Sequence, residues 1–539
     1  MKHPISRRHL FRTLTTLGAA AAAAPAGLSA QARRGASAAA AAAPAAPNVY
    51  ESLGVKPLIN GRGTFTIIGG SIELPEVRAA KSAANVHYAQ LDELMEAAGK
   101  RLGELTGAEW GMVSAGCAAA MSHATAACVA GGNPDLHVRI PNLAGFPKDE
   151  VIIPTHSRNV YDAAIRAVGV KVIEVDSPDA LQLAIGPKTA MIYIFAGPRT
   201  DSGPMSTESI CTIAKRYDVP VFVDAAAEIL TIPNVHLQRG ATLVGYSGGK
   251  YIRGPQSAGL LLGRKDLVRA AWVHSAPHHG YARAMKVGRE EIVGMVVAVE
   301  SWVKRDHAAE WKQWVARCDH IADRLSKIKG VQAFVQREAD EGLSNRSPRV
   351  TVRWNSQQFG VTGPEAADIL FRTEPRIALS NAGRPAPGQE SAGDAGVGVV
   401  TAMLADGDEK VVAQRIAQVL MEPRPPKPAE TVAAPSADLT GQWEVTISFS
   451  ASRTTHTLHL RQRGNRLEGL HQGDFLSRDI SGTINGDAVS LASVVTERHG
   501  DALNYRFRGS VSGDTIAGSL DMGEYLGATW TARRPGERA

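Results

Sequence analysis

Apolar strand-like runs alternate with amphipathic helix-like runs from Asn48 to Glu422, and this alternation constrains the fold more than any other feature. Short strands are predicted over residues 151–154, 170–175, 190–195, 219–223 and 242–246. Segments with helical spacing, such as 159–168 and 205–217, separate them. Strands that alternate with helices favour a sheet covered on both faces, so we expect an α/β fold with a mostly parallel sheet.

Two further blocks follow. Long helices over residues 286–329, short strands over 349–354, 377–380 and 396–401, and a helix over 406–420 indicate a small α+β subdomain. A stiff proline-rich linker begins at Pro423. Beyond it, Trp443, Val445 and Ile447 alternate with polar residues and Asn-Gly-type turns recur, so we expect an appended antiparallel β barrel or sandwich. No group of residues there indicates a particular chemistry, and packing or binding is its expected role.

The first residues carry an export pattern. Residues 6–11 read SRRHLF, a twin-arginine motif, and an alanine-rich stretch over 17–28 leads to a small-x-small cleavage site at 30–32. We expect a signal peptide over 1–32, a spacer over 33–47 and a periplasmic or secreted protein. The alternative is a disordered alanine-rich tail. The stretch is too short and too weakly apolar to be a stable membrane span.

Composition excludes some classes of protein. The 539 residues are too many for one core. The net charge of +6 is spread among interleaved basic and acidic residues, which favours a solvated surface over a nucleic-acid patch. The four cysteines form no C-x-x-C pair, so we expect neither a metal site nor a disulfide framework.

A lysine in a glycine-rich loop follows the last predicted strand of the first block. Residues 246–256 read YSGGKYIRGPQ, with Ser247 three residues before Lys250, and Asp224 ends an upstream apolar run. In this order the lysine can form a Schiff base with pyridoxal 5'-phosphate (PLP), the aspartate can pair with the pyridinium nitrogen, and the serine can reach the phosphate. The alternatives are a helix N-cap for Asp224 and a surface position for Lys250.

Two other strand ends offer cofactor contacts. A run of small residues precedes an alanine-rich helix whose first N–H groups could bind the PLP phosphate; it comprises Ser114, Ala115, Gly116 and Cys117. Tight helix packing would explain these small residues equally well. His156 follows the strand at 151–154 and could stack on the pyridine ring, although a lone loop histidine is more often exposed to solvent.

Candidate substrate contacts come from two basic positions. Arg199 lies in the turn-rich loop after the strand at 190–195, where parallel sheets bind ligands, and could hold a substrate anion or lie free on the surface. Arg283 and Lys286 belong to a basic, histidine-bearing segment over 274–289. That segment could complete the site across a dimer interface, or be a polar loop.

Taken together, these residues resemble the selenocysteine-synthase-like branch of fold-type-I PLP enzymes, which is aminotransferase class-V-like. That branch includes L-seryl-tRNA selenium transferase and the D-glucosaminate-6-phosphate ammonia-lyase type. The matching segments are LINGRGT at 58–64, LTGAE at 105–109, DAAAE at 224–228, SGGK at 247–250 with GPQ at 254–256, and MKVGREE at 285–291. The resemblance implies that Lys250 carries PLP, Asp224 contacts its ring nitrogen, and Ser247 with residues 114–117 holds its phosphate. His156 matches the ring-stacking position.

The resemblance also implies a domain plan. We expect a PLP-binding large domain over 48–284 and a small C-terminal subdomain over 285–422, followed by the linker over 423–437 and the β domain over 438–534. Enzymes of this fold form their sites between two subunits, so a homodimer or larger homo-oligomer is expected. No RNA-binding module precedes the catalytic segments, and an exported protein does not meet seryl-tRNA, so no nucleic-acid partner is expected.

The chemistry implied is abstraction of an α-proton followed by loss of a β-substituent. We therefore expect an ammonia-lyase type of enzyme acting on a small amino acid or amino sugar acid. The alternatives are a selenium-transferase-like protein, a PLP aminotransferase or racemase, and an exported protein of the same fold that binds without turnover.

Overall fold

The computed structural model describes residues 48–338, 342–385, 390–424, 432–496 and 502–536. The twin-arginine segment and the spacer lie outside these ranges, as do residues 425–431 of the proline-rich linker. Residues 48–56 belong to a separate short unit that contains the 3-10 turn η1 (Glu51–Leu53). Among the described residues, no helix combines the length and the apolar character that crossing a membrane requires.

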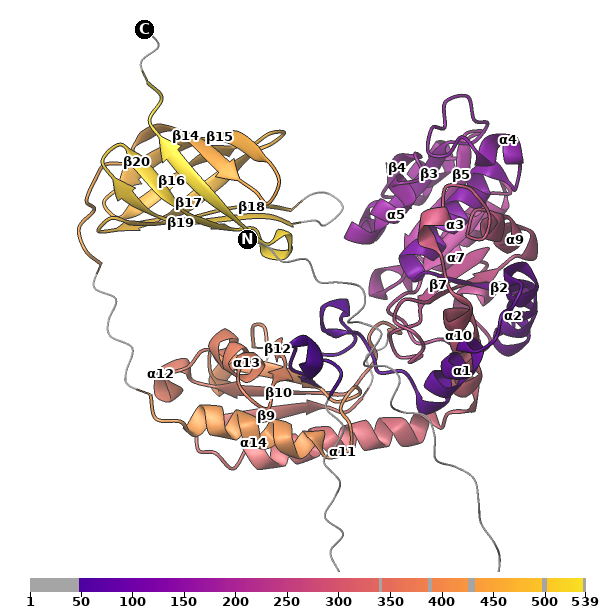
Figure 1. Cartoon of the computed structure of the whole chain (residues 1–539), viewed down its shortest axis with the longest axis horizontal. Coiled ribbons are helices and arrows are strands. Elements are labelled where there is room, and N and C mark those ends of the chain that lie inside the picture. Colours follow the sequence, from indigo (N-terminus) through magenta and orange to yellow (C-terminus); the bar gives the residue numbers. More distant parts are fainter. Residues whose placement is uncertain (1–47, 339–341, 386–389, 425–431, 497–501, 537–539) are drawn as a thin grey trace, which may run out of the picture. The chain divides into compact units, whose positions relative to one another are not determined.

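A seven-stranded sheet forms the centre of the first block, in the order β2-β8-β7-β6-β5-β3-β4 (Figure 1). Its strands are β2 (Trp110–Ser114), β3 (Glu150–Pro154), β4 (Lys171–Val175), β5 (Thr189–Phe195), β6 (Val221–Asp224), β7 (Leu243–Ser247) and β8 (Gly259–Gly263). The neighbours from β7 to β4 run parallel, and β8 runs antiparallel to both of its partners. The five predicted strands are confirmed to within two residues; β2 and β8 complete the sheet.

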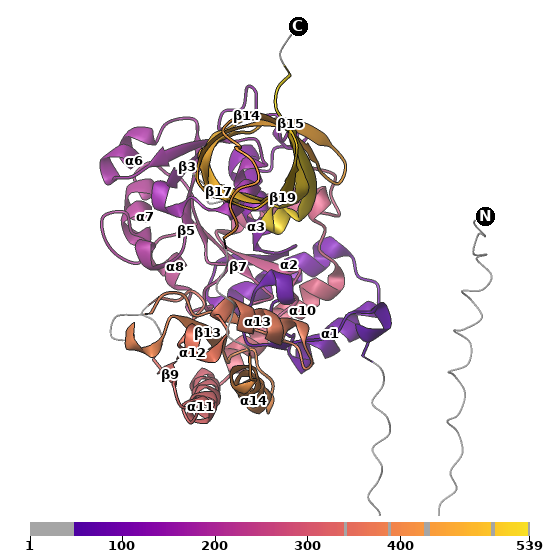
Figure 2. The same ribbon diagram turned by 90° about the vertical axis from the view of Figure 1, so that its left-hand side faces the viewer.

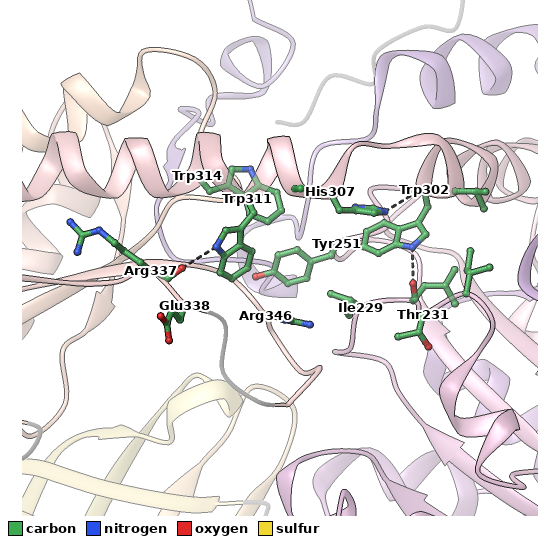
Figure 3. A pocket seen from close by; sticks show the side chains of 14 residues that line it. Ile229, Thr231, Tyr251, Trp302, His307, Trp311, Trp314, Arg337, Glu338 and Arg346 are labelled. Carbon is green, nitrogen blue, oxygen red and sulfur yellow. Dashed lines mark hydrogen bonds between the residues drawn. The ribbon is translucent and has the colours of Figure 1, made fainter.

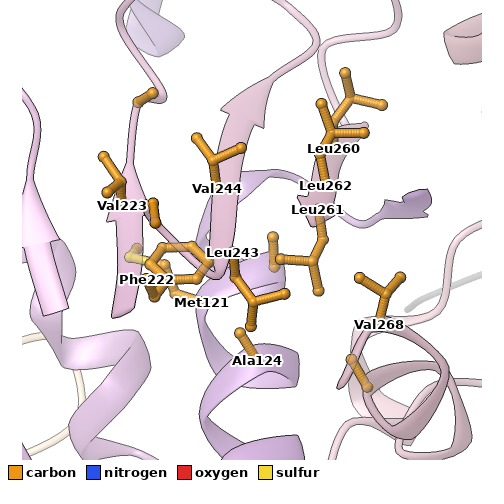
Figure 4. Close-up of a cluster of buried hydrophobic side chains, with 14 of the residues drawn as sticks. Met121, Ala124, Phe222, Val223, Leu243, Val244, Leu260, Leu261, Leu262 and Val268 are labelled. Carbon is orange, nitrogen blue, oxygen red and sulfur yellow. The ribbon is translucent and has the colours of Figure 1, made fainter. Parts of the chain in front are cut away.

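Helices pack on this sheet through small and apolar side chains. Figure 4 shows residues of β6, β7 and β8 meeting Met121 and Ala124 of α3 (Cys117–Ala130) and Val268 of α9 (Lys265–Val273). The alanines of α3 let that helix lie close to the strands, and nearly all of its residues are buried. The other helices of this block are α1 (Pro75–Asn85), α2 (Leu91–Thr106), α4 (Pro134–His137), α5 (Ala163–Arg166), α6 (Pro178–Ala184), α7 (Thr207–Lys215), α8 (Val235–Gln238) and α10 (Arg289–Lys304).

The predicted helix over 159–168 is wrong in its extent. The segment forms a 3-10 turn, η4 (Val160–Asp162), followed by the single-turn helix α5. Asn159 is the N-cap, and its side chain accepts a hydrogen bond from the Tyr161 N–H two residues on. This Asx-type contact favours the 3-10 turn over a regular helix at the start of the segment, and the α5 that follows has only four residues.

The second block packs α11 (His307–Leu325) and α14 (Asp408–Met421) against a four-stranded sheet in the order β12-β13-β10-β9. Its strands are β9 (Val331–Gln336), β10 (Arg349–Trp354), β12 (Ser380–Asn381) and β13 (Ala395–Val400), and α12 (Ser356–Phe359) and α13 (Gly363–Arg372) complete it. The predicted helical run over 286–329 divides near Asp306, whose side chain caps α11 by accepting from the Ala309 N–H. The predicted strand over 377–380 also divides, because β11 (Ile377–Ala378) pairs with β1 (Ile59–Asn60) in a different sheet.

The C-terminal residues form a closed antiparallel barrel of eight strands, β14 to β21, which settles the choice between barrel and sandwich (Figure 2). The strands are β14 (Gly441–Ser448), β15 (Arg453–Arg463), β16 (Arg466–Gln472), β17 (Ser477–Asn485), β18 (Ala488–Thr496), β19 (Ala502–Ser512), β20 (Thr515–Asp521) and β21 (Gly527–Arg533). Pairing of β14 with β21 closes the barrel. Trp443, Val445 and Ile447 point inward, as the alternation predicts, and are fully buried.

Candidate functional site

Neighbouring strands bring three candidate residues to one edge of the sheet. Gly259 at the start of β8 pairs with Ser114, the last residue of β2, and with Ser247, the last residue of β7. Asp224 ends the adjacent strand β6 and pairs with Gly245 of β7. The carboxyl ends of parallel strands are where α/β folds bind ligands, so the structure gathers Ser114, Ser247 and Asp224 where a cofactor is expected.

Gly259 leaves the space in which the start of α3 lies. A Cβ at this position would come within 2.4 Å of the Gly116 carbonyl carbon and 2.6 Å of the Cys117 nitrogen, so only glycine permits this approach. Gly116 caps α3 with φ of 87°, a conformation that favours glycine. The first N–H groups of a helix lack partners within the helix and attract anions. The backbone here has the chemistry of a phosphate site.

The carboxylate of Asp224 is buried and held by three donors. Tyr193 Oη donates to Oδ2 at 3.0 Å, and the Ala226 N–H donates to Oδ1 at 3.0 Å. Cys117 Sγ donates to Oδ1 at 3.5 Å. Asp224 is 2% exposed, and in the part of the chain that the structure describes the next helix after it, α8, begins only at Val235, which excludes the N-cap interpretation.

Lys250 lies beside this carboxylate, in the loop that joins β7 to β8. Burial lowers the pKa of its amine, and the negative charge of Asp224 opposes that effect. Burial likewise raises the pKa of the Asp224 carboxyl, against the opposing hydrogen bonds from Ala226 and Tyr193 and the charge of Lys250. Lys250 is partly buried, which argues against a surface lysine.

These residues fit the cofactor that the sequence predicts. A buried carboxylate needs a cationic partner to remain ionised, and Asp224 makes no ion pair within 4 Å among the described residues. A protonated pyridine nitrogen supplies such a cation. Lys250 supplies an amine for the aldehyde, and the start of α3 with Ser247 supplies donors for the phosphate.

His156 and Arg199 lie near each other at the same sheet edge. His156 is in the 3-10 turn η3 (Thr155–Ser157) after β3, and Arg199 is in η5 (Pro198–Thr200) after β5. Burial, with a smaller effect from the Arg199 charge, lowers the pKa of His156. The buried Nε2 of His156 has no hydrogen-bond partner, whereas Arg199 is exposed. A neutral ring of this kind suits stacking, and the exposed guanidinium suits an incoming anion.

Arg283 and Lys286 are not joined to this group within the chain. Both are exposed around the 3-10 turn η6 (Arg283–Met285), and Arg283 Nη1 donates to the Pro277 carbonyl at 3.2 Å. The charges that act on Lys250 come instead from Asp224 and Cys117. A role for the two basic residues in the site stays a prediction.

Sequence reasoning missed the residues that hold Asp224. Tyr193 lies inside β5, and its hydroxyl both donates to Asp224 and accepts from Asn159 Nδ2 at 3.0 Å. The side chain of Cys117, which the sequence suggested only as part of the phosphate loop, also contacts Asp224. The signal available in the sequence was Tyr193 itself, a residue with a polar hydroxyl inside the apolar run that forms β5.

A cavity separate from the Asp224 site is lined in part by Tyr251, the residue after Lys250. It has a volume of about 780 Å³, and Figure 3 shows the indoles of Trp302, Trp311 and Trp314 around the Tyr251 phenol. Trp302 Nε1 donates to the Leu230 carbonyl at 2.7 Å, which fixes one wall. None of the predicted site residues lines this cavity. It therefore adjoins the Lys250 loop but differs from the Asp224 site.

Known proteins resemble the chain over most of their own length. It is 31% identical over 329 residues to D-glucosaminate-6-phosphate ammonia lyase from Salmonella typhimurium, covering 59% of this chain and 85% of that protein. It is 30% identical over 347 residues to 5'-C-glycyluridine monooxygenase-decarboxylase from a Streptomyces species, covering 61% of this chain and 83% of that protein. L-seryl-tRNA(Sec) selenium transferase from Moorella thermoacetica is 27% identical over 300 residues, covering 49% of this chain and 60% of that protein.

A solved structure of D-glucosaminate-6-phosphate ammonia-lyase superposes with a TM-score of 0.60 at 28% identity, covering 69% of this chain and 98% of that one. No family profile matches the chain. The ammonia lyase and the selenium transferase are PLP-dependent enzymes, and their likeness confirms the predicted branch, the fold class and the cofactor.

Proposed function

Because the chain belongs to the branch of fold-type-I PLP-dependent enzymes that contains D-glucosaminate-6-phosphate ammonia lyase, we propose that it is an ammonia-releasing lyase. The single observation that carries this proposal is the buried Asp224 beside Lys250 at the carboxyl edge of the sheet. An intact acid and amine favour turnover over a protein that only binds.

PLP, when bound, draws electrons from the substrate's Cα and makes the proton on that carbon acidic. Lys250 would bind the cofactor aldehyde through Nζ. Burial lowers the pKa of this amine, which favours its neutral form, and a neutral amine can accept the Cα proton once substrate has freed it. Asp224 would keep a proton on the ring nitrogen. Ser247 and the first N–H groups of α3 would hold the phosphate.

The substrate we propose is a small amino acid or amino sugar acid with an anionic group. The relative at 31% identity is named for an amino sugar acid phosphate. The exposed guanidinium of Arg199 lies after β5 at the same edge as Asp224 and is the residue we assign to the substrate anion. His156 would lie against the cofactor ring.

Two further parts of this proposal concern the cellular location and the oligomeric state of the enzyme. The SRRHLF motif at 6–11 supports export by the twin-arginine route. We also propose a homodimer, in which the exposed Arg283 and Lys286 would complete the site of the partner subunit. Sedimentation of the purified protein and cell fractionation test these points.

The test of the reaction is a substrate screen. Full-length protein loaded with PLP is incubated with D- and L-amino acids and amino sugar acids, including D-glucosaminate 6-phosphate, and released ammonia and keto acid are measured. Lys250→Ala should abolish release, while Lys100→Ala, on the exposed face of α2, should leave it intact. Equal ammonia from the Lys250→Ala variant, or none from any compound, would contradict the proposal.

The second relative supports a competing activity. It is named as a monooxygenase-decarboxylase and shares 30% identity with this chain. Oxygen-dependent loss of the α-carboxyl group is therefore the second candidate. Consumption of oxygen and release of carbon dioxide without a β-substituent leaving would favour it, and an amino-acceptor requirement would indicate an aminotransferase instead.

A further inference from the structure

The interior of the C-terminal barrel divides into an apolar part and a polar end. Large apolar side chains, including Trp443, Leu467 and Trp530, fill most of it. At the end that carries the β14–β15, β16–β17 and β20–β21 turns, the inward positions are polar instead. His456, His471, Arg478 and Ser493 lie there, and each is at most 6% exposed. Buried polar residues in a small core are costly unless something satisfies them.

The two histidines are largely satisfied within the barrel. His456 Nδ1 and His471 Nε2 are 2.8 Å apart, and His471 Nδ1 lies 3.0 Å from Ser493 Oγ. Burial lowers the pKa of His471 to about 3 and also lowers that of His456. Both rings are therefore neutral near pH 7. They provide a fixed hydrogen-bonded wall and carry no charge.

Arg478 is the charged member, and among the described residues no carboxylate neutralises its charge. The side chain is buried, and its Nε and Nη1 atoms have no hydrogen-bond partner. No carboxylate of the described residues forms an ion pair with it. The nearby Asp474 is half-exposed and accepts instead from Thr454 Oγ1 at 2.5 Å, with His456 Nε2 at 3.5 Å. Among the described residues, the guanidinium of Arg478 therefore has no anionic partner, and a buried charge is costly without one.

A cavity opens at the same end of the barrel. Its volume is about 350 Å³, and its walls include Phe449, Leu503, Met522 and Tyr525. Tyr505 links the cavity to the arginine, because it lines the cavity and its ring centroid lies 4.9 Å from the Arg478 guanidinium carbon. The guanidinium itself does not line the cavity and contacts it through the Tyr505 ring. A mostly apolar cavity with a few polar groups close by is the usual make-up of a small-molecule site.

We propose that this end of the barrel binds a small monocarboxylate, whose apolar body lies in the cavity and whose carboxylate pairs with Arg478 beside the Tyr505 ring. The planar guanidinium matches a carboxylate in shape and charge. The one positive charge that the described residues place here, with neutral histidines around it, fits a monoanion better than a dianion. The site is separate from the residues assigned to PLP and belongs to the barrel alone.

Calorimetric titration of the full-length, PLP-loaded protein tests this with hexanoate, its neutral isostere hexanamide, and inorganic phosphate. Hexanoate is expected to bind saturably, and hexanamide about tenfold or more weakly. Arg478→Met should lose hexanoate binding by a similar factor. The matched control Arg461→Met changes an exposed arginine on the outer face of β15 and should bind as the wild type does.

Thermal melts separate a ligand-binding role from a structural one. Removing an unmatched buried charge should leave the melting temperature of Arg478→Met equal to or above that of the wild type. Leu503→Trp, which fills the cavity without changing the arginine, should also abolish hexanoate binding. The proposal fails if hexanoate does not bind the wild type, if it binds Arg478→Met or Leu503→Trp unchanged, or if phosphate binds in its place.

Discussion

Replacing Tyr193 with phenylalanine removes one hydroxyl from the centre of the cofactor site. That hydroxyl donates to Asp224 Oδ2 at 3.0 Å and accepts from Asn159 Nδ2 at 3.0 Å. A hydrogen bond to a charged group contributes about 1.5–3 kcal/mol, which corresponds to roughly 10- to 150-fold in an equilibrium constant. Without the bond, ionised Asp224 is less favoured and pairs less well with a pyridinium. We expect Tyr193→Phe to bind PLP more weakly by about this factor.

The assay is absorbance titration of the cofactor-free protein with PLP, with Tyr246→Phe as the matched control. Tyr246 is a buried tyrosine on β7, the strand that neighbours β6 on the side away from Tyr193. Its hydroxyl accepts a hydrogen bond from Asn234 Nδ2 at 2.7 Å. It makes no contact with Asp224, so its loss should lower the melting temperature without changing PLP affinity. If Tyr193→Phe binds PLP as tightly as Tyr246→Phe does, the hydroxyl does not hold the aspartate and the reasoning is refuted.

Three further predictions concern stability. Gly259→Ala forces a Cβ to within 2.6 Å of the Cys117 nitrogen, so it should cost about 1–3 kcal/mol in the free energy of unfolding and weaken PLP binding; an unchanged urea midpoint would contradict this. Asp306→Ala removes the cap of α11, and a loss of about 1 kcal/mol is expected in thermal melts, whereas the exposed Asp323→Ala on the same helix should have little effect. Burial lowers the pKa of His274 to about 3 and that of His123 to about 4. The unfolded chain therefore binds protons at these sites below about pH 6.5 that the folded chain does not, and stability should fall as the pH drops from about 6.5 towards 4. Urea unfolding as a function of pH checks the slope, which His274→Phe should reduce; an unchanged slope in that variant would contradict the argument.

The sequence was sufficient to predict the residues whose signal is local. Asp224 closes an apolar run and Lys250 follows a pair of glycines, so each marks a strand end or a loop within a few residues of chain. The carboxyl ends of parallel strands share an edge, and this rule brings the two together without further information.

Tyr193 could not be predicted in the same way. Its partner Asp224 lies on the next strand, and only the register, in which Ile194 pairs with Val223, brings the hydroxyl to the carboxylate. The division of the predicted strand at 377–380 has the same origin. Its first part, β11, pairs with β1, and its second part, β12, pairs with β13 in a different sheet. Contacts set by tertiary pairing leave little trace in local composition.

The polar end of the barrel was within reach of the sequence pattern. Leu458 and Leu460 alternate with polar residues in the sequence, and a period of two places His456 on the same face of the strand as these leucines. The same alternation through Ile480 places Arg478 in the interior. Inward polar residues in such a strand are exceptions to an apolar core, and the structure confirms that these side chains are buried.

The measurement that tests the central claim most directly is chemical trapping of the cofactor. Full-length protein loaded with PLP is reduced with borohydride, digested, and the modified peptide identified by mass spectrometry. We predict a phosphopyridoxyl group on the peptide that contains Lys250 and none in the Lys250→Ala variant. A group found on another lysine, or equal trapping in that variant, would contradict the assignment of Lys250 as the residue that carries PLP.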